Sequence, residues 1–225
     1  MLLLGHRGAR RYAPENTLAA FELALDHGCN GIEFDVRCTA DACAVVCHDP
    51  RFRRLDVASN TRSSLIEKDS CLPVLKDVIE QFGPRAFLYI EVKVAGLDEN
   101  VVRLLRENPP DCGFVVASFF PEVVRKFDER TLDNLDPKIP LGIICRDRAQ
   151  LAHWPELPVD YVMPRYPLVS RALVEELHSA GKRVVVWTVN RERDMRRMAE
   201  FGVDGILSDD TRLLAKTLLG QVPDS

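Results

Sequence analysis

The chain has 225 residues, of which 46% are hydrophobic and 28% are charged, proportions typical of a folded globular protein rather than a disordered or fibrous one. Its 30 basic and 34 acidic residues give a net charge of −4, which argues against a general nucleic-acid-binding surface. No apolar run approaches the ~18–20 residues of a membrane-spanning helix, and residues 1–4 are too few for a secretory signal. We therefore expect a cytoplasmic protein with no nucleic-acid partner and no integral membrane association.

The cysteines are odd in number, and their spacing forms no recognisable pattern. There is no CxxC pair and no Cys–His spacing of the zinc-finger kind. Most of them lie in apolar runs, where cysteine behaves as a small hydrophobic residue. We expect reduced, structural cysteines at all seven positions: Cys29, Cys38, Cys43, Cys47, Cys71, Cys112 and Cys145.

Short β-rich runs alternate with longer amphipathic stretches along the whole chain. The short runs predict strands at residues 2–4, 31–36, 87–92, 114–117, 141–144, 161–163, 184–188 and 205–207. The longer stretches predict helices at residues 17–27, 74–82, 99–106, 122–129, 147–153, 171–180, 191–201 and 211–219. A short extra strand at 44–47 precedes a polar stretch.

This alternation predicts one α/β domain, a single (β/α)8 TIM barrel over residues 1–225. A doubly wound open sheet is the alternative, but it usually has fewer strands at this length. The turn after the first strand, Gly5-His6-Arg7-Gly8, also lacks the GxGxxG pattern of dinucleotide-binding sheets. Residues 50–71 then form a short insertion loop after the second strand.

Carboxylates gather where the second and third strands of the predicted barrel end, the place where such barrels carry their active sites. Glu33 and Asp35 are two residues apart and therefore point to the same side of the second strand. Glu91 and Lys93 share one face of the third strand. Three converging carboxylates would repel one another unless they bind a hard cation, so we predict a divalent metal site for Mg²⁺ or Ca²⁺ at Glu33, Asp35 and Glu91.

Two histidines and several cationic or aromatic residues follow other strands of the predicted barrel. His6 and Arg7 end the first strand, and His48 follows the extra strand. Paired imidazoles exchange protons near neutral pH, and Arg7 and Lys93 suit an anionic oxygen. Trp187, at the end of the seventh strand, is either a core residue or one wall of a substrate slot. Metal, imidazoles and cations together predict phosphodiester cleavage.

The order of the motifs resembles the glycerophosphodiester phosphodiesterase family from the first strand to the last helix. Each block is weak by itself, but their succession is specific. The blocks are His6-Arg7-Gly8, Pro14-Glu15-Asn16-Thr17, Gly31-Ile32-Glu33-Phe34-Asp35-Val36, Thr39-Ala40-Asp41, Val45-Val46-Cys47-His48-Asp49, Leu72-Pro73-Val74-Leu75, Ile90-Glu91-Val92-Lys93, Ser118-Phe119, Trp187-Thr188-Val189-Asn190 and Gly202-Val203-Asp204-Gly205-Ile206-Leu207-Ser208-Asp209.

The resemblance implies hydrolysis of glycerophosphodiesters, such as glycerophosphocholine or glycerophosphoethanolamine, to glycerol 3-phosphate and an alcohol. It implies a small-molecule substrate drawn from deacylated phospholipids, and we expect a monomer or a homodimer. The implied roles are acid/base catalysis for His6 and His48, divalent metal binding for Glu33, Asp35 and Glu91, and phosphate binding for Arg7 and Lys93.

Three features depart from the family pattern. The segment 50–71 has 22 residues, fewer than the family's usual insertion, which predicts a trimmed cap over the mouth. Asp41-Ala42 replaces the usual Asp-Gly, and because alanine tolerates positive φ poorly we expect a reshaped turn. The last block lacks the proline that often follows it, which should affect only the start of the last helix.

Three other functions fit parts of the pattern less well. A sphingomyelinase-type phospholipase D shares a related His/Glu/Asp layout, but such proteins act outside the cell and contain disulfides. A non-catalytic barrel that binds a phosphorylated ligand does not need both His6 and His48. A sugar-phosphate isomerase or aldolase could use Lys93 as a Schiff base, although Glu91 and the paired histidines are better explained by metal-assisted hydrolysis.

Overall fold

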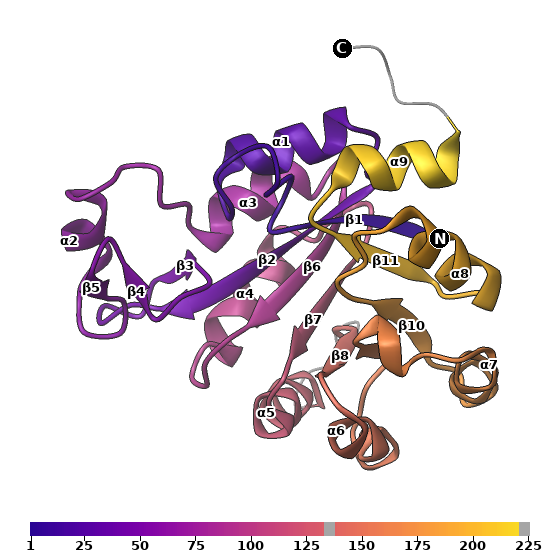
Figure 1. The fold of residues 1–225 in the computed structure, drawn as a ribbon. Coiled ribbons are helices and arrows are strands. Elements are labelled where there is room, and N and C mark those ends of the chain that lie inside the picture. The colour runs from indigo at the N-terminus through magenta and orange to yellow at the C-terminus, as the bar shows by residue number, and fades with distance from the viewer. Residues whose placement is uncertain (133–137, 221–225) are drawn as a thin grey trace.

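Eight parallel strands close into a barrel in the computed structural model, which describes residues 1–132 and 138–220 (Figure 1). Their order around the barrel is β1-β11-β10-β9-β8-β7-β6-β2, and pairing of β1 with β2 closes the ring. The predicted barrel is therefore confirmed. Its strands are β1 (Leu2–His6), β2 (Gly31–Cys38), β6 (Phe87–Val92), β7 (Phe114–Ser118), β8 (Leu141–Cys145), β9 (Tyr161–Pro164), β10 (Arg183–Val186) and β11 (Gly205–Ser208).

Helices connect successive strands and surround the barrel. Side chains of Thr17, Asp147, Ser170 and Asp210 accept backbone N–H bonds at the starts of four of them, as expected of N-cap residues. The helices are α1 (Leu18–Asp26), α3 (Leu75–Phe82), α4 (Asp98–Glu107), α5 (Pro121–Leu132), α6 (Arg148–Ala152), α7 (Arg171–Ser179), α8 (Glu192–Phe201) and α9 (Thr211–Leu219), with the 3₁₀ turns η1 (Trp154–Glu156) and η2 (Tyr166–Leu168).

The two faces of each barrel strand have different partners. Outward residues such as Ile32 and Phe34 of β2 pack under the helices, beside Phe21 and Phe82. Because side chains alternate along a strand, the residues between them point into the barrel. The interior is filled by Leu4, Phe87, Tyr89, Val115, Ala117, Ile144, Tyr161, Met163, Val185 and Leu207. Toward the carboxyl ends of the strands, the inward-facing positions carry polar side chains, which line the mouth of the barrel.

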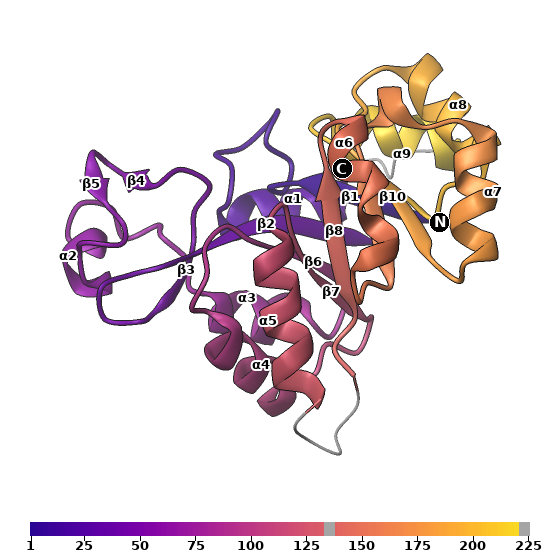
Figure 2. The same ribbon diagram turned by 90° about the horizontal axis from the view of Figure 1, so that it is seen from below.

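The segment expected to be a short loop instead forms a small folded insertion beside the barrel (Figures 1 and 2). After β3 (Ala44–Val46), which is antiparallel to β2, come the hairpin β4 (Arg51–Phe52) and β5 (Leu55–Asp56) and the helix α2 (Arg62–Ile66). Its elements are too short to show a hydrophobic period in the sequence. They nevertheless enclose a separate apolar cluster: Val45, Cys47, Val57, Leu65 and Leu72.

The turn at Asp41-Ala42 keeps the conformation that alanine was expected to avoid. Ala42 has φ +57°, and its N–H donates to the Thr39 carbonyl over 3.0 Å. The Thr39 hydroxyl also donates to Asp41 over 2.6 Å, which holds the turn from the other side. Alanine thus adopts a positive φ here, and the reshaping of the turn relative to the family stays a prediction. The turn carries the cost of a left-handed alanine, about 1–2 kcal/mol.

The seven cysteines are all free, as predicted. Within residues 1–132 and 138–220, none of the helices combines the length and the apolar character that crossing a membrane requires.

Candidate active site

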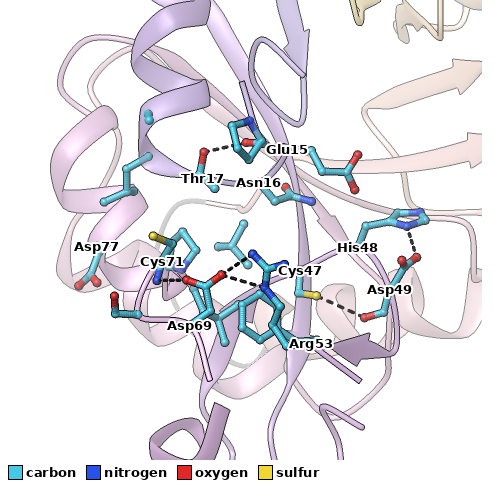
Figure 3. Close-up of a pocket in the computed structure, with 18 of the residues that line it drawn as sticks. Glu15, Asn16, Thr17, Cys47, His48, Asp49, Arg53, Asp69, Cys71 and Asp77 are labelled. Atoms are coloured by element: carbon cyan, nitrogen blue, oxygen red, sulfur yellow. Dashed lines mark hydrogen bonds and ion pairs between the residues drawn. The ribbon is translucent and has the colours of Figure 1, made fainter. Parts of the chain in front are cut away.

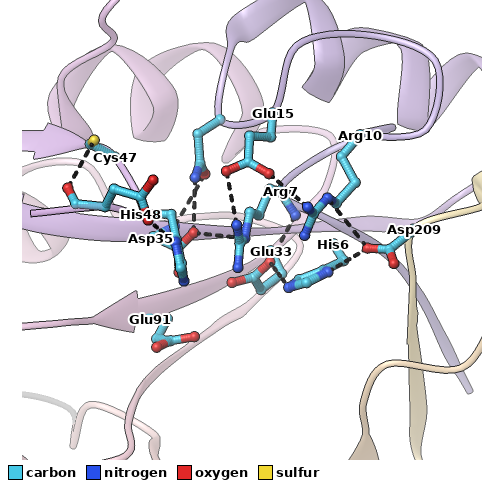
Figure 4. Close-up of polar contacts among 12 residues, drawn as sticks. His6, Arg7, Arg10, Glu15, Glu33, Asp35, Cys47, His48, Glu91 and Asp209 are labelled. Atoms are coloured by element: carbon cyan, nitrogen blue, oxygen red, sulfur yellow. Dashed lines mark hydrogen bonds and ion pairs between the residues drawn. The ribbon is translucent and has the colours of Figure 1, made fainter. Parts of the chain in front are cut away.

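Three buried carboxylates lie together at the carboxyl ends of β2 and β6 (Figure 4). Parallel register places Asp35 of β2 directly beside Glu91 of β6. Glu33, Asp35 and Glu91 are 1%, 1% and 7% exposed, and one oxygen from each lies within 4.8 Å of the others. The structure therefore brings together the three residues predicted from strand period alone.

Burial and mutual repulsion give the three carboxyl groups of this cluster different pKa values. Burial, with Asp35 and Glu91 nearby, raises the pKa of Glu33 well above its ordinary value. Burial and Asp35 likewise raise the pKa of Glu91 to about 7. Burial also acts to raise the pKa of Asp35, but Lys93 and Arg7 overcome it and lower that pKa. Lys93 and Arg7 therefore carry too little positive charge to offset three ionised carboxylates without a further cation.

Arg7, Lys93 and Asn16 hold the cluster in place. The Arg7 backbone N–H donates to Glu33 over 2.8 Å, and its Nε lies 3.1 Å from Asp35. Lys93 Nζ lies 2.9 Å from Asp35 and also pairs with Glu91. Asn16 donates to Asp35 over 2.8 Å. Arg7 and Lys93, expected to face phosphate, thus contact carboxylates in this structure, and their contact with phosphate stays a prediction.

One oxygen of the cluster has no polar partner among the described residues. Glu33 Oε1 is buried and accepts no hydrogen bond, whereas Asp35 Oδ1 is in the ion pair with Lys93, whose Nζ lies 2.9 Å away. Buried anionic oxygens without donors are costly. An all-oxygen, negatively charged donor set is the set that hard divalent cations prefer. The residues present therefore fit a cation such as Mg²⁺ or Ca²⁺.

His6, at the end of β1, is oriented by a carboxylate from the opposite end of the chain. Its Nδ1 lies 2.6 Å from Asp209 Oδ1, and its Nε2 lies 4.0 Å from Glu33. Asn190 donates to the other oxygen of Asp209 over 2.6 Å. Burial lowers the pKa of His6 despite the opposing effect of Asp209. A proton shared with Asp209 at Nδ1 leaves Nε2 free to accept another.

His48 faces the same pocket from the strand β3 side. Its Nδ1 lies 2.8 Å from Asp49, its backbone oxygen accepts a 2.7 Å bond from Arg37, and its side chain is 34% exposed. The pocket has a volume of about 630 Å³. It is lined by His6, Arg7, Arg37, His48, Tyr89, Glu91, Lys93, Phe119, Phe120, Ile144, Arg146, Arg165, Tyr166, Trp187, Thr188 and Leu207.

A second pocket of about 710 Å³ lies between the folded insertion and the start of α1, and His48 lines it as well (Figure 3). Its walls include Phe52, Leu72 and the Arg53–Asp69 ion pair, whose atoms are 2.6 Å apart. His48 therefore stands at the boundary between two hollows, with the carboxylate pocket on one side and the insertion on the other.

Trp187 lines the carboxylate pocket, so the substrate-slot alternative is compatible with its position. Its Nε1 donates to the Met163 carbonyl over 2.7 Å, and its ring meets Phe119 edge to face, with centroids 5.4 Å apart. It thus serves both packing and lining.

Several residues of this centre received no role from the sequence. Asp209, Glu15 and Asn16 occur only within motifs of the family resemblance, which implied no role for them. Neighbouring Thr17 begins the predicted helix, and its side chain caps α1. Glu15 accepts a 2.8 Å bond from Arg7. These residues lie near the strand ends in space, but the alternation of residues along the strands gave no sign of it.

The model of the glycerophosphoryl diester phosphodiesterase family matches residues 6–213. The chain belongs to this family. It is 30% identical to a glycerophosphodiester phosphodiesterase of Caldanaerobacter subterraneus over 237 residues, 95% of this chain and 96% of that one. The enzyme is accordingly a phosphoric diester hydrolase.

Solved structures agree with the fold of this family member. A glycerophosphodiester phosphodiesterase of Thermotoga maritima aligns with a TM-score of 0.81 at 26% identity, covering 96% of this chain and 97% of the other. A phosphodiesterase of Oleispira antarctica, in complex with its product sn-glycerol-3-phosphate, aligns with a TM-score of 0.82 at 24% identity, covering 97% and 96%. At that identity the second likeness concerns the fold alone.

Proposed function

We propose that this enzyme hydrolyses glycerophosphodiesters to glycerol 3-phosphate and an alcohol, using a divalent cation held by Glu33, Asp35 and Glu91. The observation that carries the proposal is the buried carboxylate cluster, in which Glu33 Oε1 accepts no hydrogen bond, beside a pocket lined by two histidines. The family match and the 30% identical glycerophosphodiester phosphodiesterase of Caldanaerobacter subterraneus support the same reaction here.

The cation, when bound, would neutralise charge on a phosphate oxygen and polarise the phosphorus centre. Arg7 and Lys93 stabilise the carboxylates and present donors at the edge of the same pocket. Because both side chains line this pocket, they would also contact the non-bridging oxygens of a bound phosphodiester. Arg7 can do so with two N–H groups, as guanidinium and phosphate geometry allows.

His6 and His48 divide the proton transfers between them. His6, with Nδ1 bound to Asp209, accepts the proton of the attacking oxygen at Nε2 as that oxygen bonds to phosphorus. His48 gives its proton to the alcohol oxygen as the bond from phosphorus to that oxygen breaks. The same groups serve attack by water and attack by the glycerol hydroxyl of the substrate, in which case water then opens a cyclic phosphate.

The test is release of glycerol 3-phosphate from glycerophosphocholine and glycerophosphoethanolamine, in EDTA and after addition of Mg²⁺ or Ca²⁺. We expect release that needs the cation and is lost in His48→Ala. His153→Ala is the matched control, because His153 is exposed, pairs with Glu156 and lines neither pocket. Release in EDTA would exclude the cation, and no release by folded, cation-loaded protein would exclude these substrates.

A further inference from the structure

Two arginines stand at the far side of the mouth from the carboxylates. Ile144 of β8 and Met163 of β9 point into the barrel, so the residues two positions later, Arg146 and Arg165, continue the same inward face. Both line the 630 Å³ pocket. In the closed order of strands, β8 lies opposite β1, and β9 lies opposite β2. A substrate whose phosphate sits at the carboxylate cluster thus extends toward these arginines.

Neither guanidinium has an acidic partner among the described residues. The Arg146 guanidinium instead lies over the Phe119 ring, 4.9 Å from its centroid, and Lys93 Nζ lies 5.6 Å from the same centroid. Some arginines of the chain are paired, for example Arg53 with Asp69 and Arg85 with Glu22, whereas Arg146 and Arg165 line a pocket and are unpaired within the described part of the chain. The Phe119 ring therefore lies between Lys93, beside the carboxylates, and Arg146, which has no acidic partner among the described residues.

More positively charged side chains line the pocket than one phosphodiester, with its single negative charge, can neutralise. Arg7 and Lys93 are already paired with the carboxylate cluster. Arg37 adds a third cation, whose Nε bonds only to the His48 carbonyl, a neutral group. Arg146 and Arg165 then add two more charges, whereas a phosphodiester brings a single negative charge. Planar guanidinium groups in such a position are well suited to a second phosphate.

We propose that Arg146 and Arg165 form a second anion subsite that selects glycerophosphodiesters whose alcohol carries another phosphate group. The inference rests on the proposed function and names its substrate class. The second phosphate can be a monoester or a further diester, since both present anionic oxygens to the two arginines. Alcohols with a cationic group, such as choline, meet repulsion at this subsite and are the poorer substrates.

Paired substrates test the subsite directly. Glycerophosphoinositol 4-phosphate is compared with glycerophosphoinositol, and bis(glycerophospho)glycerol with glycerophosphoglycerol. The first pair differs by one phosphate monoester and the second by one glycerophosphoryl group, so the two pairs separate monoester from diester. We expect kcat/KM to be higher for the phosphorylated member by about tenfold, the effect of one charge-assisted hydrogen bond. The ratio should fall toward one in the double variant Arg146→Gln, Arg165→Gln, mainly through KM.

Arg197→Gln is the matched control, because Arg197 also lies over an aromatic ring, 5.1 Å from the Phe201 centroid, but does not line this pocket. It should keep the wild-type ratio. A wild-type ratio near one for both pairs would overturn the inference while leaving the proposed function standing. A double variant that loses activity equally on both members of a pair would also overturn it, because the arginines would then contact the scissile phosphate. No turnover of any of the four by protein that releases glycerol 3-phosphate from glycerophosphocholine would overturn the subsite alone, and no turnover of these or of glycerophosphocholine and glycerophosphoethanolamine would overturn the proposed function as well.

Discussion

Replacing Glu33 by glutamine separates the charge of the carboxylate cluster from its shape. Glu33 uses one oxygen to accept the Arg7 backbone N–H over 2.8 Å, and the other is buried without a donor. Glutamine keeps the first contact with its carbonyl oxygen. Its amide nitrogen then takes the place of the unsatisfied oxygen and can donate toward the neighbouring carboxylates. The substitution therefore favours the cation-free protein and removes a ligand from the cation-bound one.

The sign of the pH dependence follows from the Glu33 pKa, which burial and its neighbours raise well above the ordinary value. A carboxyl with a raised pKa binds its proton more tightly in the folded state, so stability is lost as the pH rises through that pKa. In EDTA, the wild-type protein should therefore lose stability as the pH rises above 4.5, the ordinary pKa of this group, by up to about 1.4 kcal/mol per pH unit until Glu33 is ionised in the folded state. Glu33→Gln should show a shallower decline.

A bound cation reverses this loss. At a concentration 100 times its dissociation constant, a ligand that binds only the folded state stabilises it by about 2.7 kcal/mol. For a chain of 225 residues, this corresponds to a rise in Tm of about 5–10 °C. The wild-type protein should show that rise with Mg²⁺ or Ca²⁺, and Glu33→Gln should show little or none.

Scanning calorimetry in EDTA and in each cation measures both effects without any assay of activity. Glu175→Gln is the control, because Glu175 is an exposed carboxylate on α7, away from the cluster. It should retain the full rise in Tm. An equal rise in wild type and Glu33→Gln would refute the assignment of Glu33 as a ligand. A Tm of wild type that neither EDTA nor any divalent cation changes would refute the cation site as a whole.

Other substitutions probe the remaining parts of the structure. Asp209→Asn should lower kcat by about 100-fold or more, since it removes the carboxylate 2.6 Å from His6 that fixes its tautomer and supports proton transfer; an unchanged kcat in steady-state assays would contradict this. Ala42→Gly should raise the free energy of unfolding in urea by about 0.5–1 kcal/mol, because it relieves a left-handed alanine at φ +57°. Leu65→Ala should cost about 2–5 kcal/mol, mainly within the insertion, where Leu65 is fully buried; hydrogen exchange should then show loss of protection at residues 50–72 before the barrel.

The barrel and its carboxylates could be predicted because both follow from alternation along strands. Glu33 and Asp35 interrupt an otherwise apolar strand at a spacing of two, and Glu91 does the same on the next strand of the barrel. Period two fixes the face of a side chain, and a closed parallel barrel fixes the end at which such faces meet. Local sequence therefore contained enough information to bring these three residues together.

Contacts made by loops could not be predicted in the same way. Asp209 meets His6 across 203 positions of sequence, and Asn16 meets Asp35 from a loop that reads as a helix start. Arg146 and Arg165 each lie one residue beyond the end of their strand, where no apolar pattern marks the inward face. The folded insertion escaped prediction because two-residue strands and a five-residue helix are stabilised by tertiary contact rather than by a pattern of their own.

Backbone strain distinguishes the site from the turn at Ala42. Arg7 and Asn16 also have positive φ, +55° and +57°, at a cost of order 1–3 kcal/mol each. Their conformations are matched by contacts that need these side chains: Asn16 both donates to Asp35 over 2.8 Å and accepts its N–H over 3.3 Å, and its own N–H bonds to the Arg7 carbonyl. Ala42 is exposed and its side chain makes no polar contact. Substitution by glycine at Ala42 therefore relieves strain and removes no polar contact. The same substitution at Asn16 removes the hydrogen bonds that hold the buried Asp35 carboxylate. Asn16 thus keeps a strained backbone because its side chain holds Asp35 in place. At this position the geometry of the carboxylate cluster matters more than the stability of the loop.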